Sequence, residues 1–227
     1  MAAFARRPLP LLLLCVGAFA LILACAYARA WRPARALFPV QGIDVSHHQG
    51  RIDWGRVRRA GVDFAYIKAT EGGDQRDPRF ADNWRGARAA GLRAGAYHFF
   101  TLCRPGAEQA ANFAAVVPAT PDALPPVIDV ELGGNCAARP TRTAVLAELT
   151  ATLHGIERHS GKPAILYVTQ EFDTVYGIST ALPRRLWLRS LFVPPRYGAR
   201  DWTIWQASNI RHVDGISGWV DWNVIRR

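Results

Sequence analysis

The sequence lacks the short motifs that mark several common classes of enzyme. It contains no glycine-rich phosphate loop, and this absence argues against a nucleotide-binding enzyme. No serine stands in the G-x-S-x-G turn that exposes the nucleophile of many hydrolases. The four cysteines show neither the C-x-x-C nor the histidine spacing of a zinc site. We therefore expect a protein that works without a cofactor.

Acidic residues are absent from the first 36 residues, and lysine is scarce throughout the chain. Residues 1–36 contain five arginines, which account for half of the net charge of +10. Only Lys68 and Lys162 are lysines among the 28 basic residues, which indicates a compositional bias. A nucleic-acid-binding surface needs a basic cluster with stacking aromatic residues. The sequence has no such cluster, so we expect no nucleic-acid partner.

Residues 8–28 form an uncharged run of 21 residues behind Arg6 and Arg7. Such a run is long enough to cross a bilayer as a helix, and the preceding arginines are typical of a signal or an anchor. Three fates are open: retention as a signal anchor, cleavage after Ala30, or cleavage before Cys25 with lipidation. A buried core helix is the alternative to all three.

Each of the three fates places the rest of the chain outside the cytoplasm. We divide the chain into residues 1–36, a signal anchor or signal peptide with its linker, and residues 37–227, the functional domain. We expect this domain at the periplasmic face of the inner membrane, or secreted after cleavage. Cys103 and Cys136 agree with this location, because an even pair of cysteines in an exported domain is a candidate disulfide. Two unrelated buried thiols are the alternative.

The remainder of the chain alternates short apolar runs with helical stretches. Nearly continuous apolar runs are typical of parallel strands covered by helices. The runs that predict strands are residues 41–46, 63–68, 93–100, 126–131, 164–169, 186–188 and 203–206. The stretches that predict helices are residues 53–60, 82–90, 106–116 and 141–159, with Asp82 as a cap and Gly161 just past the last end. Five strand–helix alternations followed by closing strands predict an α/β barrel or an open α/β sheet.

Asp129 and Glu131 stand two residues apart at the end of a predicted strand. Side chains alternate along a strand, so both point to the same face with Cα atoms about 6.6 Å apart. Two carboxylates this close repel each other, and one tends to keep its proton near neutral pH. Glycoside cleavage uses such a pair, because one group donates a proton to the leaving oxygen while the other stabilises positive charge. A salt-bridged pair at a strand end is the alternative.

Other polar and aromatic side chains fall at the carboxyl ends of the predicted strands, where α/β barrels carry their functional residues. The aromatic rings can stack on the apolar faces of sugar rings, although core packing is the alternative for each of them. The candidates for sugar contact are Tyr66, Tyr97, His98, Tyr167, Trp187, Trp205 and Gln206. The candidate acids beyond the pair are Asp44, Asp214 and Asp221.

His47 and His48 lie close to these acids in the predicted arrangement and raise the alternative of a metal site, since imidazole and carboxylate are common ligands. Neighbouring residues of a strand point to opposite faces, so two adjacent histidines do not easily serve one ion. We therefore expect no functional metal.

Several stretches of the sequence resemble the family 25 glycoside hydrolases, the lysozymes of the Chalaropsis type. They lie in one order over about residues 42 to 225, which is nearly the whole domain. The matching stretches are GIDVSHHQGRIDW (42–54), FAYIKATEG (64–72), AGLRAGAYHFF (90–100), QAANF (109–113), LPPVIDVE (124–131), KPAILYV (162–168), LW (186–187), IWQ (204–206) and VDGISGWVDWNV (213–224).

The resemblance implies a flattened, TIM-like (β/α)5(β)3 barrel behind the N-terminal hydrophobic helix. It also implies hydrolysis of the β-1,4 bond between N-acetylmuramic acid and N-acetylglucosamine in the glycan strands of peptidoglycan. By position, Glu131 resembles the general acid/base, and Asp129 resembles its partner that assists the substrate acetamido group. Asp44 matches the acid of the first strand, and either Asp214 or Asp221 matches a late aspartate.

One departure from the family follows Trp187, where many members have a small residue and then an aromatic residue. This chain has Arg189 and Leu191 in that segment, so Arg189 is a candidate to meet a carboxylate of the peptide stem. We expect a monomeric muramidase that remodels the wall of its own cell. A sugar-binding module that has lost catalysis is the rival interpretation, and the intact acids argue against it.

Overall fold

The computed structural model describes residues 9–226, which fall into two compact units. The first unit ends at Trp31, and the second begins at Arg32. Residues 1–8 of the predicted N-terminal segment, which include Arg6, Arg7 and Pro8, lie outside the described residues.

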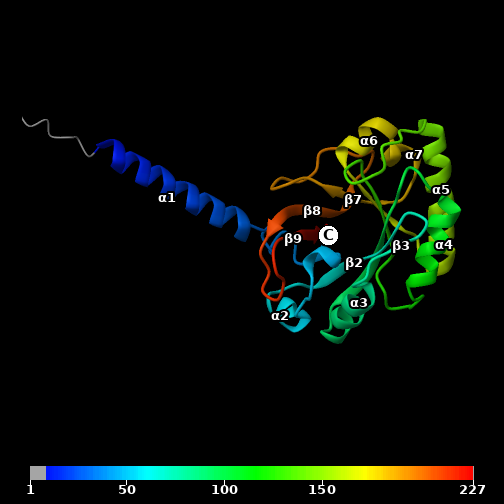
Figure 1. The fold of residues 1–227 in the computed structure, drawn as a ribbon, viewed down its shortest axis with the longest axis horizontal. Helices are drawn as coiled ribbons and strands as arrows, with labels where there is room; N and C mark the ends of the chain where they lie inside the picture. Colours follow the sequence, from blue (N-terminus) through cyan, green and yellow to red (C-terminus); the bar gives the residue numbers. More distant parts are fainter. Residues whose placement is uncertain (1–8, 227) are drawn as a thin grey trace, which may run out of the picture. The chain divides into compact units, whose positions relative to one another are not determined.

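The described part of the first unit is the helix α1 (Leu9–Ala30), drawn in blue in Figure 1. Its residues Leu13–Ala30 have a mean hydropathy of 2.0, and by length and composition they can cross a membrane. None of this stretch is buried, unlike most of the core helix of a soluble protein. A signal sequence near the N-terminus has the same properties, so retention, cleavage, and cleavage with lipidation all stay predictions.

The second unit is built on a closed sheet of eight strands. These strands are β1 (Gln41–Val45), β2 (Phe64–Glu71), β4 (Arg93–Phe99), β5 (Val127–Val130), β6 (Ile165–Val168), β7 (Arg185–Arg189), β8 (Trp202–Arg211) and β9 (Val220–Ile225). They are ordered β1-β9-β8-β7-β6-β5-β4-β2, and pairing of β1 with β2 closes the barrel. Neighbours are parallel except at β9, which runs antiparallel to β1 and β8. A short strand, β3 (Gln75–Arg76), pairs antiparallel with the end of β2.

Helices follow β1, β2, β4, β5 and β6 along the chain. They are α2 (Trp54–Arg59), α3 (Phe80–Ala89), α4 (Gly106–Val116), α5 (Arg142–Ser160), α6 (Gln170–Tyr176) and α7 (Ile178–Ala181). Figure 1 shows α4 and α5 side by side on one flank of the sheet. The order of these elements confirms the predicted (β/α)5(β)3 barrel, and β9 is its third closing strand.

Local sequence signals explain several of the helix ends. The side chain of Asp53 accepts a hydrogen bond from Arg56 N at 3.0 Å and caps α2. Gly161 adopts the left-handed conformation (φ +67°) that ends α5, as predicted. The prediction of Asp82 as a cap is wrong, because α3 begins at Phe80. Asp82 instead lies in the first turn, where it pairs with Arg85 at 2.6 Å.

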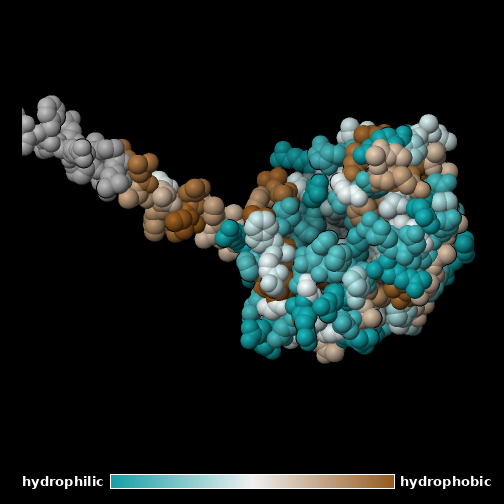
Figure 2. All heavy atoms as spheres, viewed as in Figure 1, coloured by the Kyte–Doolittle hydropathy of each residue, from teal (hydrophilic) through white to brown (hydrophobic). Residues whose placement is uncertain are grey.

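Large side chains fill the interior of the barrel. One buried cluster contains Phe64, Tyr66, Val127, Ile165, Tyr167, Trp187 and Ile204. The interior is therefore a packed core rather than a channel, as in other α/β barrels. The surface of this unit is mainly hydrophilic on the face that Figure 2 shows, whereas the part of α1 that is drawn in colour is mainly apolar.

Residues of the predicted linker pack onto the barrel. The guanidinium of Arg35 donates to Pro39 O at 2.8 Å and to Asp63 Oδ2 at 3.0 Å. Gln41 Nε2 donates to Pro33 O at 2.8 Å. These contacts join the segment from Arg32 onward to the second unit, ahead of the functional boundary predicted at residue 37.

Candidate active site

A cavity of about 270 Å³ lies among the strand ends and is bordered below by the aromatic core. It is lined by Asp44, Tyr97, Val127, Asp129, Glu131, Tyr167, Trp187, Arg189, Gln206, Asn209 and Asp221. A second cavity, of about 420 Å³, shares Asp44, Tyr97, Asp129, Glu131 and Asp221 with the first. The four carboxyl groups therefore lie where the two cavities adjoin, as the catalytic groups of a substrate groove would.

The barrel strands bring these four carboxyl groups together from distant parts of the sequence. Asp44 on β1 and Asp221 on β9 are directly paired in the antiparallel register. Asp129 lies near the end of β5, and Glu131 follows the last residue of that strand. Carboxyl ends of parallel strands share one end of a barrel, which brings Asp44, Asp129 and Glu131 together. Asp221 reaches the same end because it stands near the start of β9, which runs antiparallel to β1.

Asp44 is held by amide side chains of β8 and β9. Its Oδ2 accepts hydrogen bonds from Asn223 Nδ2 at 2.7 Å and from Gln206 Nε2 at 3.4 Å. Gln206 Oε1 in turn accepts from the Tyr167 hydroxyl at 2.9 Å, and Asn223 Oδ1 accepts from Trp187 Nε1 at 3.0 Å. Burial raises the pKa of Asp44, and the hydrogen bond from Asn223 opposes that rise. This network orients Asp44 and the two rings as one unit.

Asp129 and Glu131 occupy different environments although they are neighbours. Burial raises the pKa of Asp129 well above its ordinary value, and the charges of Glu131 and Asp44 raise it further. The Oδ1 atom of Asp129 is buried and has no hydrogen-bond partner among the described residues. Burial also raises the pKa of Glu131, but the guanidinium of Arg189 opposes this effect from 3.6 Å. Both groups are thus biased toward the protonated form, with Glu131 subject to a nearby cation.

The structure brings Asp221 to the cavity and leaves Asp214 outside it. Burial raises the pKa of Asp221 well above its ordinary value, and the charge of Asp44 adds to that rise. The side chain of Asp214 is 69% exposed and lies 3.6 Å from the guanidinium of Arg56 on α2. Of the two late aspartates that the sequence left open, Asp221 is the one placed with the other acids.

The predicted sugar contacts divide into two groups. Tyr97, Tyr167, Trp187 and Gln206 line the cavity. Tyr66, His98 and Trp205 line neither of the two cavities, so the structure does not bring them to the carboxyl cluster. The hydroxyl of Tyr66 donates to Pro125 O at 3.1 Å, below the site. A strand end predicts only the neighbourhood of a residue, since alternate side chains point into different layers.

His98 is a buried structural histidine. Its Nδ1 lies 2.8 Å from Thr70 Oγ1, and its Nε2 lies 3.1 Å from Gln109 Oε1. Gln109 Oε1 also accepts from Thr101 N at 2.9 Å, so it acts as an acceptor and His98 Nε2 carries the proton. Burial lowers the pKa of His98 to about 4, which keeps the ring neutral.

The reasoning that placed His47 and His48 on opposite faces of a strand is wrong. Both lie in a short 3-10 helix (His47–Gln49), and their ring centroids are 4.1 Å apart. His47 Nδ1 lies 2.9 Å from Asp77 Oδ2. Within residues 9–226, no three His, Cys, Asp or Glu side chains are grouped so that they could hold a metal ion.

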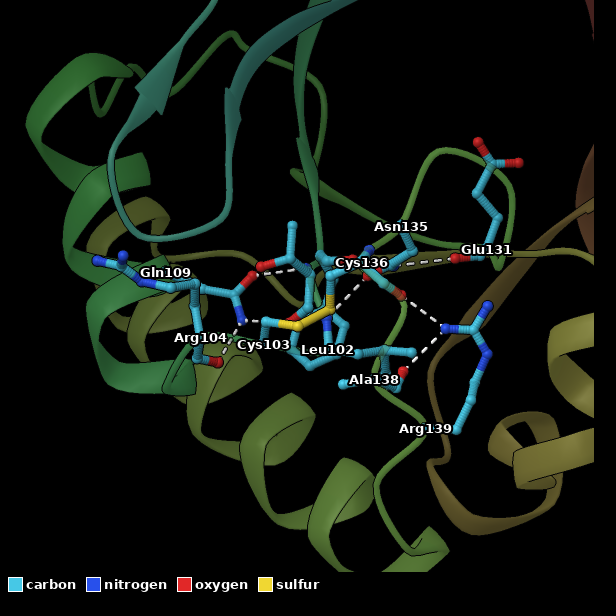
Figure 3. The surroundings of a disulfide bond; sticks show 11 residues. Leu102, Cys103, Arg104, Gln109, Glu131, Asn135, Cys136, Ala138 and Arg139 are labelled. Carbon is cyan, nitrogen blue, oxygen red and sulfur yellow. Dashed lines mark hydrogen bonds between the residues drawn. A yellow bond between two sulfur atoms is a disulfide. The ribbon is translucent and has the colours of Figure 1, made fainter.

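The loop that carries Glu131 is cross-linked to the loop that follows β4 (Figure 3). Cys103 and Cys136 form the predicted disulfide. Next to it, Asn135 Nδ2 donates to Phe100 O at 2.8 Å and to Glu131 O at 3.0 Å. Asn135 Oδ1 accepts from Leu102 N at 2.9 Å. The loop after β5 is therefore tied to the neighbouring rim by one covalent bond and several hydrogen bonds.

Sequence reasoning missed Asn135, Asn209 and Asn223. Asn223 had a usable signal, because it lies two residues after Asp221 and so faces the same side of a strand. Asn135 had none, since its role depends on the path of a loop. Arg189 was singled out as a departure from the family, but its contact with Glu131 was not predicted.

Known proteins resemble this chain over most of the barrel. The family model described as Glycosyl hydrolases family 25 matches residues 43–216. The protein of Escherichia coli (strain K12) named "Uncharacterized protein YegX" is 37% identical over 197 residues, which are 83% of this chain and 70% of the relative. "Lysozyme M1" of Streptomyces globisporus is 36% identical over 201 residues, or 81% of this chain and 67% of the relative.

A solved structure shares the fold as well. The family 25 glycosyl hydrolase from Bacillus anthracis superposes with a TM-score of 0.80 at 38% identity, and the match covers 87% of this chain and 92% of that one. The family model covers more than half of the chain and includes Asp44, Asp129 and Glu131 of the carboxyl cluster. The chain therefore belongs to glycosyl hydrolase family 25.

Proposed function

We propose that this chain is a muramidase that hydrolyses the β-1,4 bond between N-acetylmuramic acid and N-acetylglucosamine in peptidoglycan. One observation carries the proposal: four carboxyl groups with raised pKa values meet at a cavity lined by aromatic rings. A carboxyl group that keeps its proton near neutral pH can act as a general acid. Aromatic rings beside it suit a sugar substrate, whose ring faces are apolar. The family and the name of the Streptomyces relative support the same activity.

Glu131 is best suited to proton transfer. Its side chain is 23% exposed at the opening of the site, so it can exchange protons with water. In the first step Glu131 donates its proton to the glycosidic oxygen, and the bond between that oxygen and the anomeric carbon breaks. In the second step the Glu131 carboxylate takes a proton from water as the water attacks the anomeric carbon.

Asp129 is more buried than Glu131 and is suited to orient the acetamido group of the substrate. Its buried Oδ1 atom can accept a hydrogen bond from the N–H of the substrate acetamido group. That bond would orient the acetamido oxygen toward the anomeric carbon, where it displaces the leaving group and forms a cyclic intermediate. The water activated by Glu131 then opens this intermediate. Asp44 and Asp221 border the same space, and in the ionised form either would stabilise the positive charge that develops on the sugar.

We further propose that the barrel works outside the cytoplasm, tethered by α1 or released after cleavage. The disulfide agrees with an oxidising compartment, and α1 is long and apolar enough for either fate. Extraction of membranes with alkaline carbonate tests the tether. An anchored protein stays in the pellet, whereas a cleaved one appears in the soluble fraction without α1.

Replacing Glu131 by Gln tests the proposed role of the acid. Loss of a general acid is expected to lower the rate of peptidoglycan hydrolysis by about 100-fold or more, with the melting temperature little changed. Asp214→Asn is the matched control, because that carboxyl group is exposed and outside the cavity, and it should leave the rate unchanged. A Glu131→Gln variant that solubilises cell wall at the normal rate would refute the assignment. Wall binding by the natural protein without release of reducing ends would support the inactive sugar-binding module.

A further inference from the structure

Arg189 lies at the end of β7 between two carboxylates. Its guanidinium nitrogens are 3.6 Å from Glu131 Oε2 and 3.7 Å from Glu171 Oε2 on α6. Both distances are longer than a charge-assisted hydrogen bond, which is typically about 2.7–2.9 Å. The cation is therefore shared between the two acids and bound tightly by neither.

Hydrogen bonds hold the backbone of Arg189 in place, whereas its side chain lies between two acids. Arg189 N donates to the Tyr197 hydroxyl at 2.9 Å, and that hydroxyl donates to Val168 O at 2.8 Å. This bridge joins the ends of β6 and β7. The side chain of Arg189 is 35% exposed, and that of Glu171 is 66% exposed. A flexible cation on a fixed stem can move toward either acid without rearrangement of the barrel.

We infer that Arg189 is a positioning residue whose guanidinium is shared between Glu131 and Glu171. The more strongly Glu171 attracts this guanidinium, the less the guanidinium stabilises the ionised form of Glu131, the proposed acid. The inference rests on the proposed function of Glu131. It gives Arg189 a role in the reaction, and it gives Glu171 a role that acts through Arg189. Glu171 itself lines neither of the two cavities around the carboxyl cluster.

Several other charged or titratable groups surround this pair. The groups that affect Glu131 or Arg189 are Asp44 on β1, Lys68 on β2, Asp129 on β5, Tyr167 on β6, Glu171 on α6, Tyr197 in the loop after β7, and Asp221 on β9. Lys68 is the other nearby cation, but its Nζ lies 2.6 Å from Glu71 Oε2 and is thereby largely neutralised. Arg189 is thus the adjustable cation among them.

Two substitutions are expected to shift the pH profile in opposite directions. In Arg189→Met the carboxyl group of Glu131 loses its cation and holds its proton to higher pH. In Glu171→Gln the guanidinium is released toward Glu131, which then ionises at lower pH. The alkaline limb of kcat/KM against pH should therefore move up in the first variant and down in the second, each by about 0.5–1 pH unit for a partly exposed pair.

The double variant distinguishes sharing from a direct effect of the Glu171 charge. If Glu171 acts through Arg189, Glu171→Gln should have little effect in an Arg189→Met background. If the two shifts add, Glu171 acts on Glu131 directly and the inference fails. Arg189→Lys should restore most of the normal profile, because it keeps the cation.

The measurement uses the full chain on purified peptidoglycan and on glycan strands stripped of peptide by an amidase. Arg196→Met and Asp201→Asn are controls for loss of one exposed charge of each sign, and both should leave the profile unchanged. Equal shifts on both substrates support the positioning role. Shifts confined to peptide-bearing substrate would overturn it and assign Arg189 to a stem carboxylate. Loss of all activity in Glu131→Gln, measured separately, tests the proposed function and not this inference.

Discussion

At the scale of single residues, burial decides which polar side chains serve the site and which serve the fold. Asp129 and His98 lie on adjacent strands, yet they differ in what surrounds them. Asp129 lines the cavity and has one buried oxygen that finds no hydrogen-bond partner within residues 9–226. His98 has partners at both ring nitrogens and faces the core. A buried polar group with all its partners in the protein stabilises the fold, and one left without a partner is available to a ligand.

His98 should make the stability of the barrel depend on pH. Burial lowers the pKa of His98 from 6.5 to about 4, so the unfolded chain binds a proton that the folded chain does not bind between these values. The free energy of unfolding therefore decreases as pH falls from 6.5 toward 4, by on the order of 3 kcal/mol.

Urea unfolding at several pH values, for the natural protein and for His98→Gln, measures this contribution. The free energy of unfolding of the natural protein should approach that of His98→Gln as pH falls, because the Gln side chain does not titrate. Replacement of the exposed His212 by Gln is the control and should leave the pH dependence as it is. Identical pH dependence in the natural protein and in His98→Gln would contradict the account.

At the scale of elements, the loop after β5 is the segment on which the site depends most. It carries Glu131 and is joined to the rim of β4 by the Cys103–Cys136 disulfide and by Asn135. A native disulfide that closes a loop of this size typically contributes about 2–4 kcal/mol. Replacing both cysteines by Ser is therefore expected to lower the free energy of unfolding by about that amount.

Denaturant titrations with and without dithiothreitol test the disulfide. Reduction should lower the denaturant concentration at the unfolding midpoint of the natural protein to that of the Cys103→Ser/Cys136→Ser variant. The midpoint of the variant should not change on reduction. An unchanged midpoint on reduction would mean that the bond contributes nothing to stability.

The sequence predicted elements where one local signal was strong. Apolar runs identified the barrel strands before β9, and helical spacing with Gly161 identified α5. β9 was not assigned a residue range, because Asp221 and Asn223 interrupt its apolar character and serve the site instead. α6 and α7 are short and begin at residues without a clear apolar pattern. The pair Asp129 and Glu131 was predictable from a two-residue spacing, whereas the place of Arg189 depended on how β7 and α6 meet.

At the scale of the whole molecule, the boundary between the two compact units falls before the first residue of the predicted domain. Arg35 bonds to Pro39 and Asp63, and these bonds would be lost if the domain began at residue 37. A chain of residues 32–227 is therefore expected to be more stable than one of residues 37–227, by about 1–3 kcal/mol for hydrogen bonds to charged groups. Thermal unfolding of the two chains checks this, and equal melting temperatures would show that the segment is dispensable.

We propose above all that the barrel cleaves the β-1,4 bond from N-acetylmuramic acid to N-acetylglucosamine, and not the bond from N-acetylglucosamine to N-acetylmuramic acid. Mass analysis of the fragments released from borohydride-reduced digests of a defined peptidoglycan tests it most directly. A muramidase leaves N-acetylmuramic acid at the reducing end, so the account predicts reduced muramic acid in every new end, and none in digests with Glu131→Gln. Reduced glucosamine ends, or no new reducing ends from the natural protein, would contradict it.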